Sequence, residues 1–129
     1  MNQTATYGLT HIAVVVKNVD ETLRFYTSVF GMEVMYHGKD FVQLTTPGCH
    51  DIMVFENSPR DQIGITGGIT HFGFRLRNKE DIDQMMERIT AAGGKITDSG
   101  EFVPGSPYVF FRDLDGYEVE VWYESDLPN

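Results

Sequence analysis

The sequence predicts an α+β fold in which two βαβββ modules pair to form a curved mixed sheet with its helices on the convex face. Two observations favour this fold: the chain repeats part of itself at a nearly fixed offset, and each copy has the same order of strand and helix patterns. At 129 residues the chain has room for a single domain, residues 1–129. We expect one module at about residues 8–56 and the other at about 68–124, joined by a linker over 57–67 that contains proline and glycine.

The internal repeat has two parts. Residues 8–18, GLTHIAVVVKN, align without gaps on residues 68–78, GITHFGFRLRN. A second match pairs FVQLTTPGCHDIMVFEN, which starts at Phe41, with YVFFRDLDGYEVEVWYE, which starts at Tyr108. Similarity at a regular spacing indicates duplicated architecture, so each half is expected to be one βαβββ unit.

Each module is predicted to begin with a strand and to continue with a helix. Apolar residues alternate at period two in residues 9–16 and 69–76, which is typical of a strand with one buried face. Asn18 and Glu21 have the spacing of a capping box, and Gly31 suits the left-handed end of the helix that follows. Three shorter strand patterns come after each helix. They cover residues 32–37, 40–46 and 51–56 in one module, and 95–102, 107–113 and 117–123 in the other.

Strand alternation assigns the two faces of the predicted sheet, because successive side chains point to opposite sides. If Ile12 and Phe72 pack beneath the helices, then His11 and His71 point the other way. The last predicted strand places Glu120 on a polar face as well. We therefore expect an acidic, concave surface that no helix covers.

His11, His71 and Glu120 form a ligand set of two imidazoles and one carboxylate, which holds a divalent transition metal and leaves positions open for substrate. The two histidines occupy the same position of the two repeats, so a pseudo-twofold axis between the modules would bring them together. The competing interpretation is a pair of hydrogen-bonded strand histidines and a solvated glutamate.

The repeats, the opening LTHIAVVVKNVDETLRFYTSVFGMEV, the second GITHFGFRL and the closing FFRDLDGYEVEVWYE resemble the vicinal oxygen chelate superfamily over about residues 8–124. That superfamily includes glyoxalase I, fosfomycin-resistance enzymes, extradiol ring-cleaving dioxygenases and bleomycin-resistance proteins. The resemblance implies one divalent metal ion (Fe, Mn, Ni, Co or Zn) held by His11, His71 and Glu120, with Glu120 as the catalytic residue. It also implies a homodimer in which His11 of one subunit meets His71 and Glu120 of the other.

No subfamily pattern is complete in this chain. Glyoxalase I has a fourth ligand, a glutamate in the last strand of the first half, and the internal alignment pairs Glu120 with Met53. That alignment puts Glu56 on the opposite face and leaves Asp51 as the nearby carboxylate. The acid–base tyrosine of ring-cleaving dioxygenases falls on Phe110, and the threonine of fosfomycin-resistance enzymes is replaced by alanine.

These departures leave the reaction class open. We expect an enzyme whose metal chelates adjacent oxygens of a small substrate and stabilises an oxyanion or enediolate, by glyoxalase-like lyase or isomerase chemistry or by ring cleavage. One alternative is a non-enzymatic drug-binding protein of the bleomycin-resistance type, for which the net charge of -9 is suitable. Another is a thiol transferase of the fosfomycin-resistance type.

The predicted concave side also carries candidate substrate contacts. Arg75 lies on the face of His71 and would clamp an anionic group, although a surface ion pair explains this residue equally well. Aromatic side chains on the same side suit a small apolar or aromatic substrate. The expected substrate-binding residues are Arg75, Phe55, Tyr108, Phe110 and Trp122.

Charge and composition argue against several classes of partner. The chain has ten Lys and Arg residues but nineteen Asp and Glu residues, and this excess of negative charge repels nucleic-acid phosphates and anionic lipids. The longest apolar run, residues 12–16, is far shorter than the roughly 18 residues of a membrane helix, and the first residues lack a signal-peptide pattern. We expect a cytoplasmic protein with a small-molecule substrate and no nucleic-acid or membrane partner.

Overall fold

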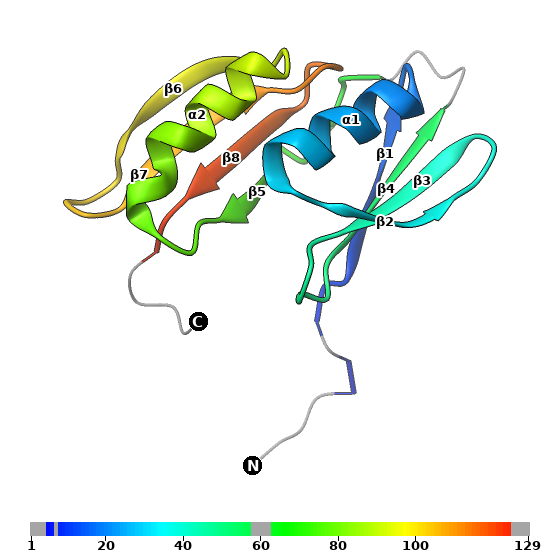
Figure 1. Cartoon of the computed structure of the whole chain (residues 1–129), viewed down its shortest axis with the longest axis horizontal. Helices are drawn as coiled ribbons and strands as arrows, with labels where there is room; N and C mark the ends of the chain where they lie inside the picture. The colour runs from blue at the N-terminus through cyan, green and yellow to red at the C-terminus, as the bar shows by residue number, and fades with distance from the viewer. Residues whose placement is uncertain (1–4, 7, 58–62, 125–129) are drawn as a thin grey trace. The chain divides into compact units, whose positions relative to one another are not determined.

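The computed structural model describes residues 5, 6, 8–57 and 63–124 and contains the two predicted βαβββ units (Figure 1). The chain divides into two compact units, Met1–Arg60 and Asp61–Asn129. The division falls inside the expected linker, of which residues 58–62 lie outside the described residues. Each unit has one four-stranded mixed sheet and one α-helix, so the predicted α+β fold is confirmed.

The first unit has the strand order β1-β4-β3-β2. Strands β1 and β4 are parallel, whereas β3 is antiparallel to both of its neighbours. A parallel pair needs a crossover, and the intervening helix and hairpin supply it. The elements of this unit are β1 (His11–Val16), α1 (Val19–Phe30), β2 (Glu33–His37), β3 (Phe41–Thr45) and β4 (Ile52–Asn57).

The second unit repeats this topology with the order β5-β8-β7-β6. Strands β5 and β8 are parallel, and β7 is antiparallel to β8 and β6. Its elements are β5 (Phe72–Arg75), a short 3-10 turn η1 (Lys79–Asp81), α2 (Ile82–Ala91), β6 (Lys95–Glu101), β7 (Pro107–Arg112) and β8 (Glu118–Trp122).

The ends of α1 follow the predicted capping chemistry. The Asn18 side chain accepts a hydrogen bond from the backbone N–H of Glu21 at 3.0 Å, which satisfies one amide that the helix leaves unpaired. At the other end Gly31 has φ 67°, the left-handed conformation that glycine adopts without steric cost. Neither helix in the described part of the chain has the length and apolar character needed to span a membrane.

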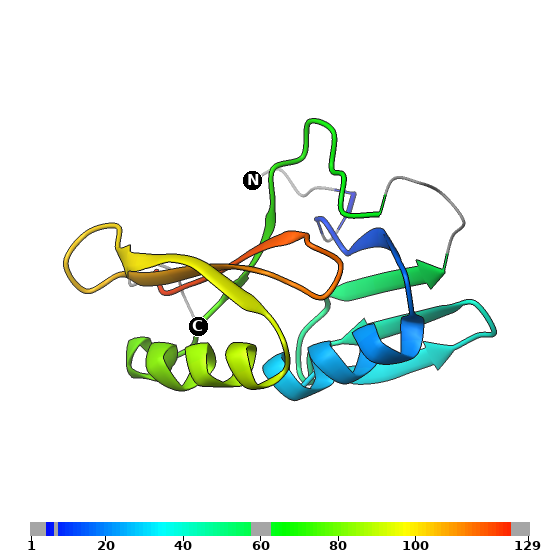
Figure 2. The ribbon, with the colours of Figure 1, turned by 90° about the horizontal axis from the view of Figure 1, so that it is seen from above.

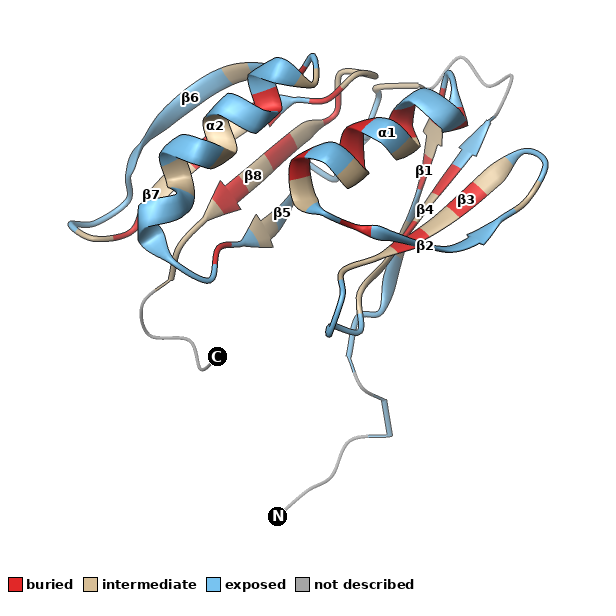
Figure 3. Ribbon diagram, in the orientation of Figure 1, coloured by how far each residue is buried: buried red, intermediate tan, exposed pale blue. Residues whose placement is uncertain are grey.

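In each unit the helix covers one face of the sheet and leaves the other uncovered. Helix α1 packs on β3 and β4, and α2 packs on β6 and β7 (Figure 2). Burial alternates accordingly along β8, where Val119 and Val121 are buried and Glu118, Glu120 and Trp122 are half-buried (Figure 3). We call the side of each sheet that faces away from its helix the open face.

The outer strands β2 and β6 each contain one unpaired extra residue. The pairing of β2 with β3 skips Met35, and the pairing of β6 with β7 skips Thr97. Such an insertion is a β-bulge, which bends the strand and increases its twist. Because the two bulges face equivalent positions of β3 and β7, the duplication extends to the detailed hydrogen-bond register.

Candidate functional site

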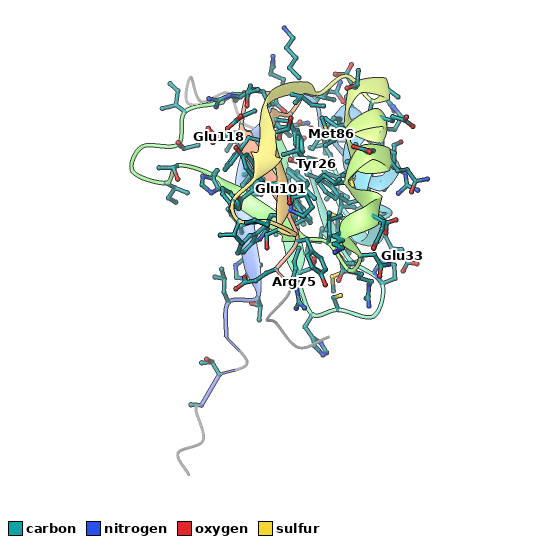
Figure 4. All side chains as sticks on the ribbon, turned by 90° about the vertical axis from the view of Figure 1, so that its left-hand side faces the viewer. Tyr26, Glu33, Arg75, Met86, Glu101 and Glu118 are labelled. Atoms are coloured by element: carbon teal, nitrogen blue, oxygen red, sulfur yellow. The ribbon has the colours of Figure 1, made fainter. Side chains whose placement is uncertain are left out.

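The open face of the second sheet carries three rows of side chains that run across its strands. Figure 4 shows Glu118 on the side of this sheet away from α2, the helix that carries Met86. The register defines the rows. Glu118 lies beside Arg112, Glu120 lies between Gly73 and Phe110, and Trp122 lies between Arg75 and Tyr108.

His71, which directly precedes β5, lies next to two of these acids. Its Nε2 atom is 4.0 Å from Oε1 of Glu120, and its Nδ1 atom is 3.9 Å from Oε1 of Glu118. The Glu120 side chain is only 14% exposed. Burial raises the pKa of Glu120; the imidazole of His71 acts in the opposite direction and the nearby Glu118 charge adds to the rise.

Two of the three predicted metal ligands therefore meet on one face. Nitrogen and oxygen ligands each about 2.1 Å from one ion lie roughly 3 Å apart, so a small rotation of His71 or Glu120 brings both into range. An imidazole and a carboxylate suit Mn, Fe, Co, Ni or Zn in the divalent state. Within each unit, the described residues contain no group of three His, Cys, Asp or Glu side chains close enough to hold a metal. The third predicted ligand, His11, belongs to the first unit.

Both histidines have the same local environment on one ring nitrogen. Thr70 Oγ1 lies 3.0 Å from Nδ1 of His71, and Thr10 Oγ1 lies 3.2 Å from Nδ1 of His11. In each repeat a neighbouring hydroxyl thus occupies Nδ1 and leaves Nε2 as the nitrogen for a further partner. A hydrogen bond to one nitrogen of a metal-binding histidine is the usual way to orient the other.

Gly73 makes room for the Glu120 carboxylate. A Cβ atom at this position would lie 3.3 Å from Oε1 of Glu120 and 3.2 Å from its backbone oxygen. Both distances are shorter than ordinary van der Waals contact between carbon and oxygen. Glycine therefore lets this side chain lie over β5, next to His71.

An aromatic cluster lies along the same open face. The rings of Phe102 and Tyr108 stack with centroids 4.1 Å apart, and Trp122 meets Phe102 edge to face at 6.0 Å. Phe110 lies 5.2 Å from the His71 ring in a T-shaped arrangement. These rings form an apolar surface next to the His71 and Glu120 pair, and they include three of the predicted substrate contacts.

Phe102 was missed from the sequence. It follows directly after β6, two residues beyond Gly100 and four beyond Asp98, so the alternation of the strand puts all three on one face. Gly100 and Asp98 pair with Tyr108 and Phe110 of β7. The same alternation, read from the sequence, would have assigned Phe102 to the open face. The hydroxyl of Tyr108 also donates a hydrogen bond to Asp98 at 3.1 Å.

The predicted role of Phe55 is wrong, because this residue lies on the helix-covered face. It is fully buried at 0% exposure, and its ring centroid is 4.7 Å from that of Tyr26 in α1. The open face of the first sheet carries instead the residues at the alternate positions of β4, namely Ile52, Val54 and Glu56.

The strand register also corrects the internal alignment. Gly73 pairs with Glu120 in the second sheet, and the equivalent Ala13 pairs with Val54 in the first. The counterpart of Glu120 is therefore Val54, not Met53, which is buried. The position still lacks a carboxylate, so the departure from glyoxalase I remains.

The same one-residue shift changes the predicted faces of the two nearby acids, Glu56 and Asp51. Glu56 lies on the open face with His11, whereas it was expected on the opposite side. Asp51 precedes β4 and serves the turn, because its carboxylate accepts hydrogen bonds from the backbone N–H of Thr46 at 2.8 Å and from the Thr46 hydroxyl at 2.6 Å. Asp51 is thus a turn residue.

The chain matches the family model of the glyoxalase/bleomycin resistance protein/dioxygenase superfamily over residues 8–121. It belongs to this superfamily. An uncharacterized protein of Pseudomonas aeruginosa is 30% identical over 126 residues, which cover 92% of this chain and 90% of that protein.

Two relatives with named activities are more distant and much longer. A manganese-dependent 2,3-dihydroxybiphenyl 1,2-dioxygenase of Geobacillus genomosp. 3 is 23% identical over 92% of this chain and 37% of its own length. A probable chloroplastic lactoylglutathione lyase of Arabidopsis thaliana is 26% identical over 92% of this chain and 36% of its own length.

A solved structure supports the fold assignment. The fosfomycin resistance protein FosX of Listeria monocytogenes superposes with a TM-score of 0.78, at 23% identity, over 94% of this chain and 96% of FosX. At this level of identity the match demonstrates a shared fold.

Proposed function

We propose that this protein is a metal-dependent enzyme of the vicinal oxygen chelate type, with His11, His71 and Glu120 as ligands of one divalent ion. The observation that carries the proposal is the meeting of His71 and Glu120 on an open sheet face, beside an aromatic surface. A carboxylate with a shifted pKa next to an apolar surface is typical of functional sites.

Two relatives support a metal of this class. One is named a manganese-dependent dioxygenase, and a variant of the Listeria monocytogenes FosX was solved with Mn(II) and 1S,2S-dihydroxypropylphosphonic acid. We propose Mn, Fe, Co, Ni or Zn for this chain, since two imidazoles and one carboxylate suit each of them.

A bound divalent ion supplies Lewis-acid stabilisation of negative charge on two adjacent substrate oxygens. The chain's own residues hold and enclose the substrate. Phe110 and Trp122 provide an apolar wall that excludes water and strengthens local electrostatic interactions. Arg75, beside Trp122 in the register, is our candidate for an anionic group of the substrate.

Two residues next to the ligands depart from the patterns of the named subfamilies, and they do not select one reaction class. Phe110, directly beside Glu120, cannot transfer a proton, and Val54 cannot supply a fourth carboxylate ligand. Glyoxalase-like lyase or isomerase chemistry, ring cleavage and thiol transfer to an epoxide each remain as candidate reactions. Oxygen uptake with catechols, isomerisation of a hemithioacetal and thiol addition to an epoxide distinguish these three chemistries directly.

We propose that the protein is a homodimer and that one subunit supplies His11 while its partner supplies His71 and Glu120. Metal analysis tests this arrangement. Protein purified without chelator should contain about one divalent ion per chain, and His11→Ala and Glu120→Ala should each abolish metal uptake without unfolding, because the apolar cores form without metal. Glu87→Gln, on the exposed side of α2, is the charge-matched control for the Glu120 variant.

Mixing the two variants tests the shared site. A heterodimer of His11→Ala and Glu120→Ala subunits contains one complete ligand set and one set with both defects. Metal binding should therefore return after the subunits are exchanged. Continued absence of metal in verified heterodimers would show that all three ligands come from one subunit.

The second candidate is a drug-binding protein of the bleomycin-resistance type. The stacked rings of Phe102 and Tyr108, close to Trp122, and the net charge of -9 favour a flat cationic ligand. Trp122 is the single tryptophan, so its fluorescence reports binding at this cluster. Metal-free protein that binds bleomycin with unchanged affinity after Glu120→Ala would support this candidate against the enzyme.

A further inference from the structure

Glu118 lies beside a proposed metal ligand but has no part in the proposed ligand set. Its Oε1 atom is 3.9 Å from Nδ1 of His71, the ring nitrogen opposite the one that faces Glu120. Its Oε2 atom is 3.4 Å from Nη2 of Arg112. The carboxylate is thus held between a guanidinium and an imidazole.

Arg112 is itself anchored to the turn before β8. Its Nη1 group donates a hydrogen bond to the backbone carbonyl of Gly116 at 3.2 Å. This contact orients the guanidinium toward Glu118, its neighbour across the β7 and β8 ladder. Because one oxygen of Glu118 faces Arg112, the other is directed to His71.

The corresponding position in the first unit has no acid. Strand pairing sets His11 opposite Ile52, which is the counterpart of Glu118 in the first unit. Nδ1 of His11 therefore has the Thr10 hydroxyl as a neighbour, but Ile52 offers it no carboxylate. The two otherwise similar histidines differ in this respect. A charged group placed at only one of two repeated sites indicates a role specific to that site.

We propose that Glu118 is a positioning residue for His71. Its carboxylate stabilises the tautomer that carries the proton on Nδ1, and it thereby presents the Nε2 lone pair next to Glu120. The metal-binding consequence of this step rests on the proposed function, whereas the tautomer itself is a property of the metal-free chain.

The electrostatics of the imidazole support this assignment. A neutral ring carries one N–H, and a nearby negative charge favours the proton on the nitrogen that faces it. Glu120 alone would attract the proton to Nε2, the atom needed for a metal. Glu118 acts on the opposite nitrogen and offsets this preference, and in the resulting tautomer the Thr70 hydroxyl accepts the hydrogen bond from Nδ1–H. At 3.9 Å the effect of Glu118 is electrostatic, and it becomes a direct hydrogen bond when the side chain moves by about 1 Å.

Nitrogen NMR of the metal-free protein tests the tautomer. The ring nitrogens of His71, assigned with a His71→Ala variant, should report mainly Nδ1–H once the ring is neutral, and Glu118→Gln should increase the Nε2–H fraction. Glu87→Gln removes the same charge from α2 and should leave the spectrum unchanged. Wild-type protein with mainly Nε2–H, or a Glu118→Gln spectrum identical to wild type, overturns the proposal.

Calorimetric titration with Mn(II) and Zn(II) tests the consequence. Glu118→Gln should weaken metal binding by about 10- to 100-fold, the range seen for outer partners of ligand histidines, and Glu87→Gln should not weaken it. Complete loss of binding, equal to that of Glu120→Ala, would make Glu118 a ligand and overturn the positioning role. If wild-type protein takes up no metal, the proposed function fails, while the NMR result still decides the tautomer.

Discussion

Replacing Phe55 with alanine distinguishes a core residue from a substrate contact. The side chain is fully buried and packs on Tyr26, which is buried as well. Truncating a buried phenylalanine costs about 3 to 5 kcal/mol, from lost burial and from the cavity that remains. With an unfolding entropy of roughly 2.1 cal/mol/K per residue, this loss lowers the Tm of a chain of this size by at least about 10 °C. Urea denaturation followed by circular dichroism measures the change in the free energy of unfolding.

Phe41→Ala is the matched control, because Phe41 lies on the open face of the same sheet, beside Glu56. It is half-buried, so we expect a loss of about 1 kcal/mol. Metal and ligand binding by the folded fraction of Phe55→Ala should equal that of wild type. If Phe55→Ala kept wild-type stability but no longer bound ligand, the assignment of Phe55 to the buried, helix-covered face would be refuted.

Three further outcomes follow from the geometry. Gly73→Ala should weaken Mn(II) binding roughly tenfold in calorimetric titrations, because the added methyl displaces the Glu120 carboxylate. Asp113→Ala should lower the free energy of unfolding by about 3 kcal/mol in urea, because this buried carboxylate accepts two backbone N–H groups of the turn before β8. Asp20→Asn should lower the pKa of His37 in proton NMR titrations, since the backbone carbonyl of the next residue and the Asp20 carboxylate raise it. That stabilisation is present below the pKa of the unfolded state and is lost as pH rises through the folded pKa, so the difference in stability between variant and wild type should decrease toward alkaline pH.

In the part of the chain that the structure describes, period-two and period-3.6 patterns were sufficient to predict the strands and the two α-helices. The strand expected at residues 40–46 is observed as Phe41–Thr45, and the one expected at 117–123 as Glu118–Trp122. Alternation also assigned His71 and Glu120 to one face, since a strand buried on a single side fixes which side chains point outward.

The first-unit face was harder to predict because the two repeats have turns of different length. Six residues join β3 to β4, whereas five join β7 to β8. A gapless alignment that crosses this turn moves the last strand by one position, and one position exchanges the faces. Phe55 and Glu56 were assigned to the wrong sides for this reason.

The contacts around His71 depend on information that spacing does not contain. The position of Glu118 between Arg112 and Nδ1 of His71 depends on the cross-strand register and on side-chain rotamers. Phe102 ends the strand predicted at 95–102, so its parity gives its face, but its stacking on Tyr108 depends on the pairing of β6 with β7. Tertiary pairing therefore determines the finer chemistry of the candidate site.

The bulges at Met35 and Thr97 have a consequence for self-association. An outermost strand presents unpaired N–H and C=O groups, to which a strand from another molecule can add and begin a fibrillar aggregate. One additional residue in β2 and one in β6 break the even spacing of those groups, so an incoming straight strand would lose its hydrogen bonds on passing the irregularity. Removing Met35 or Thr97 should therefore shorten the lag time of aggregation at high protein concentration.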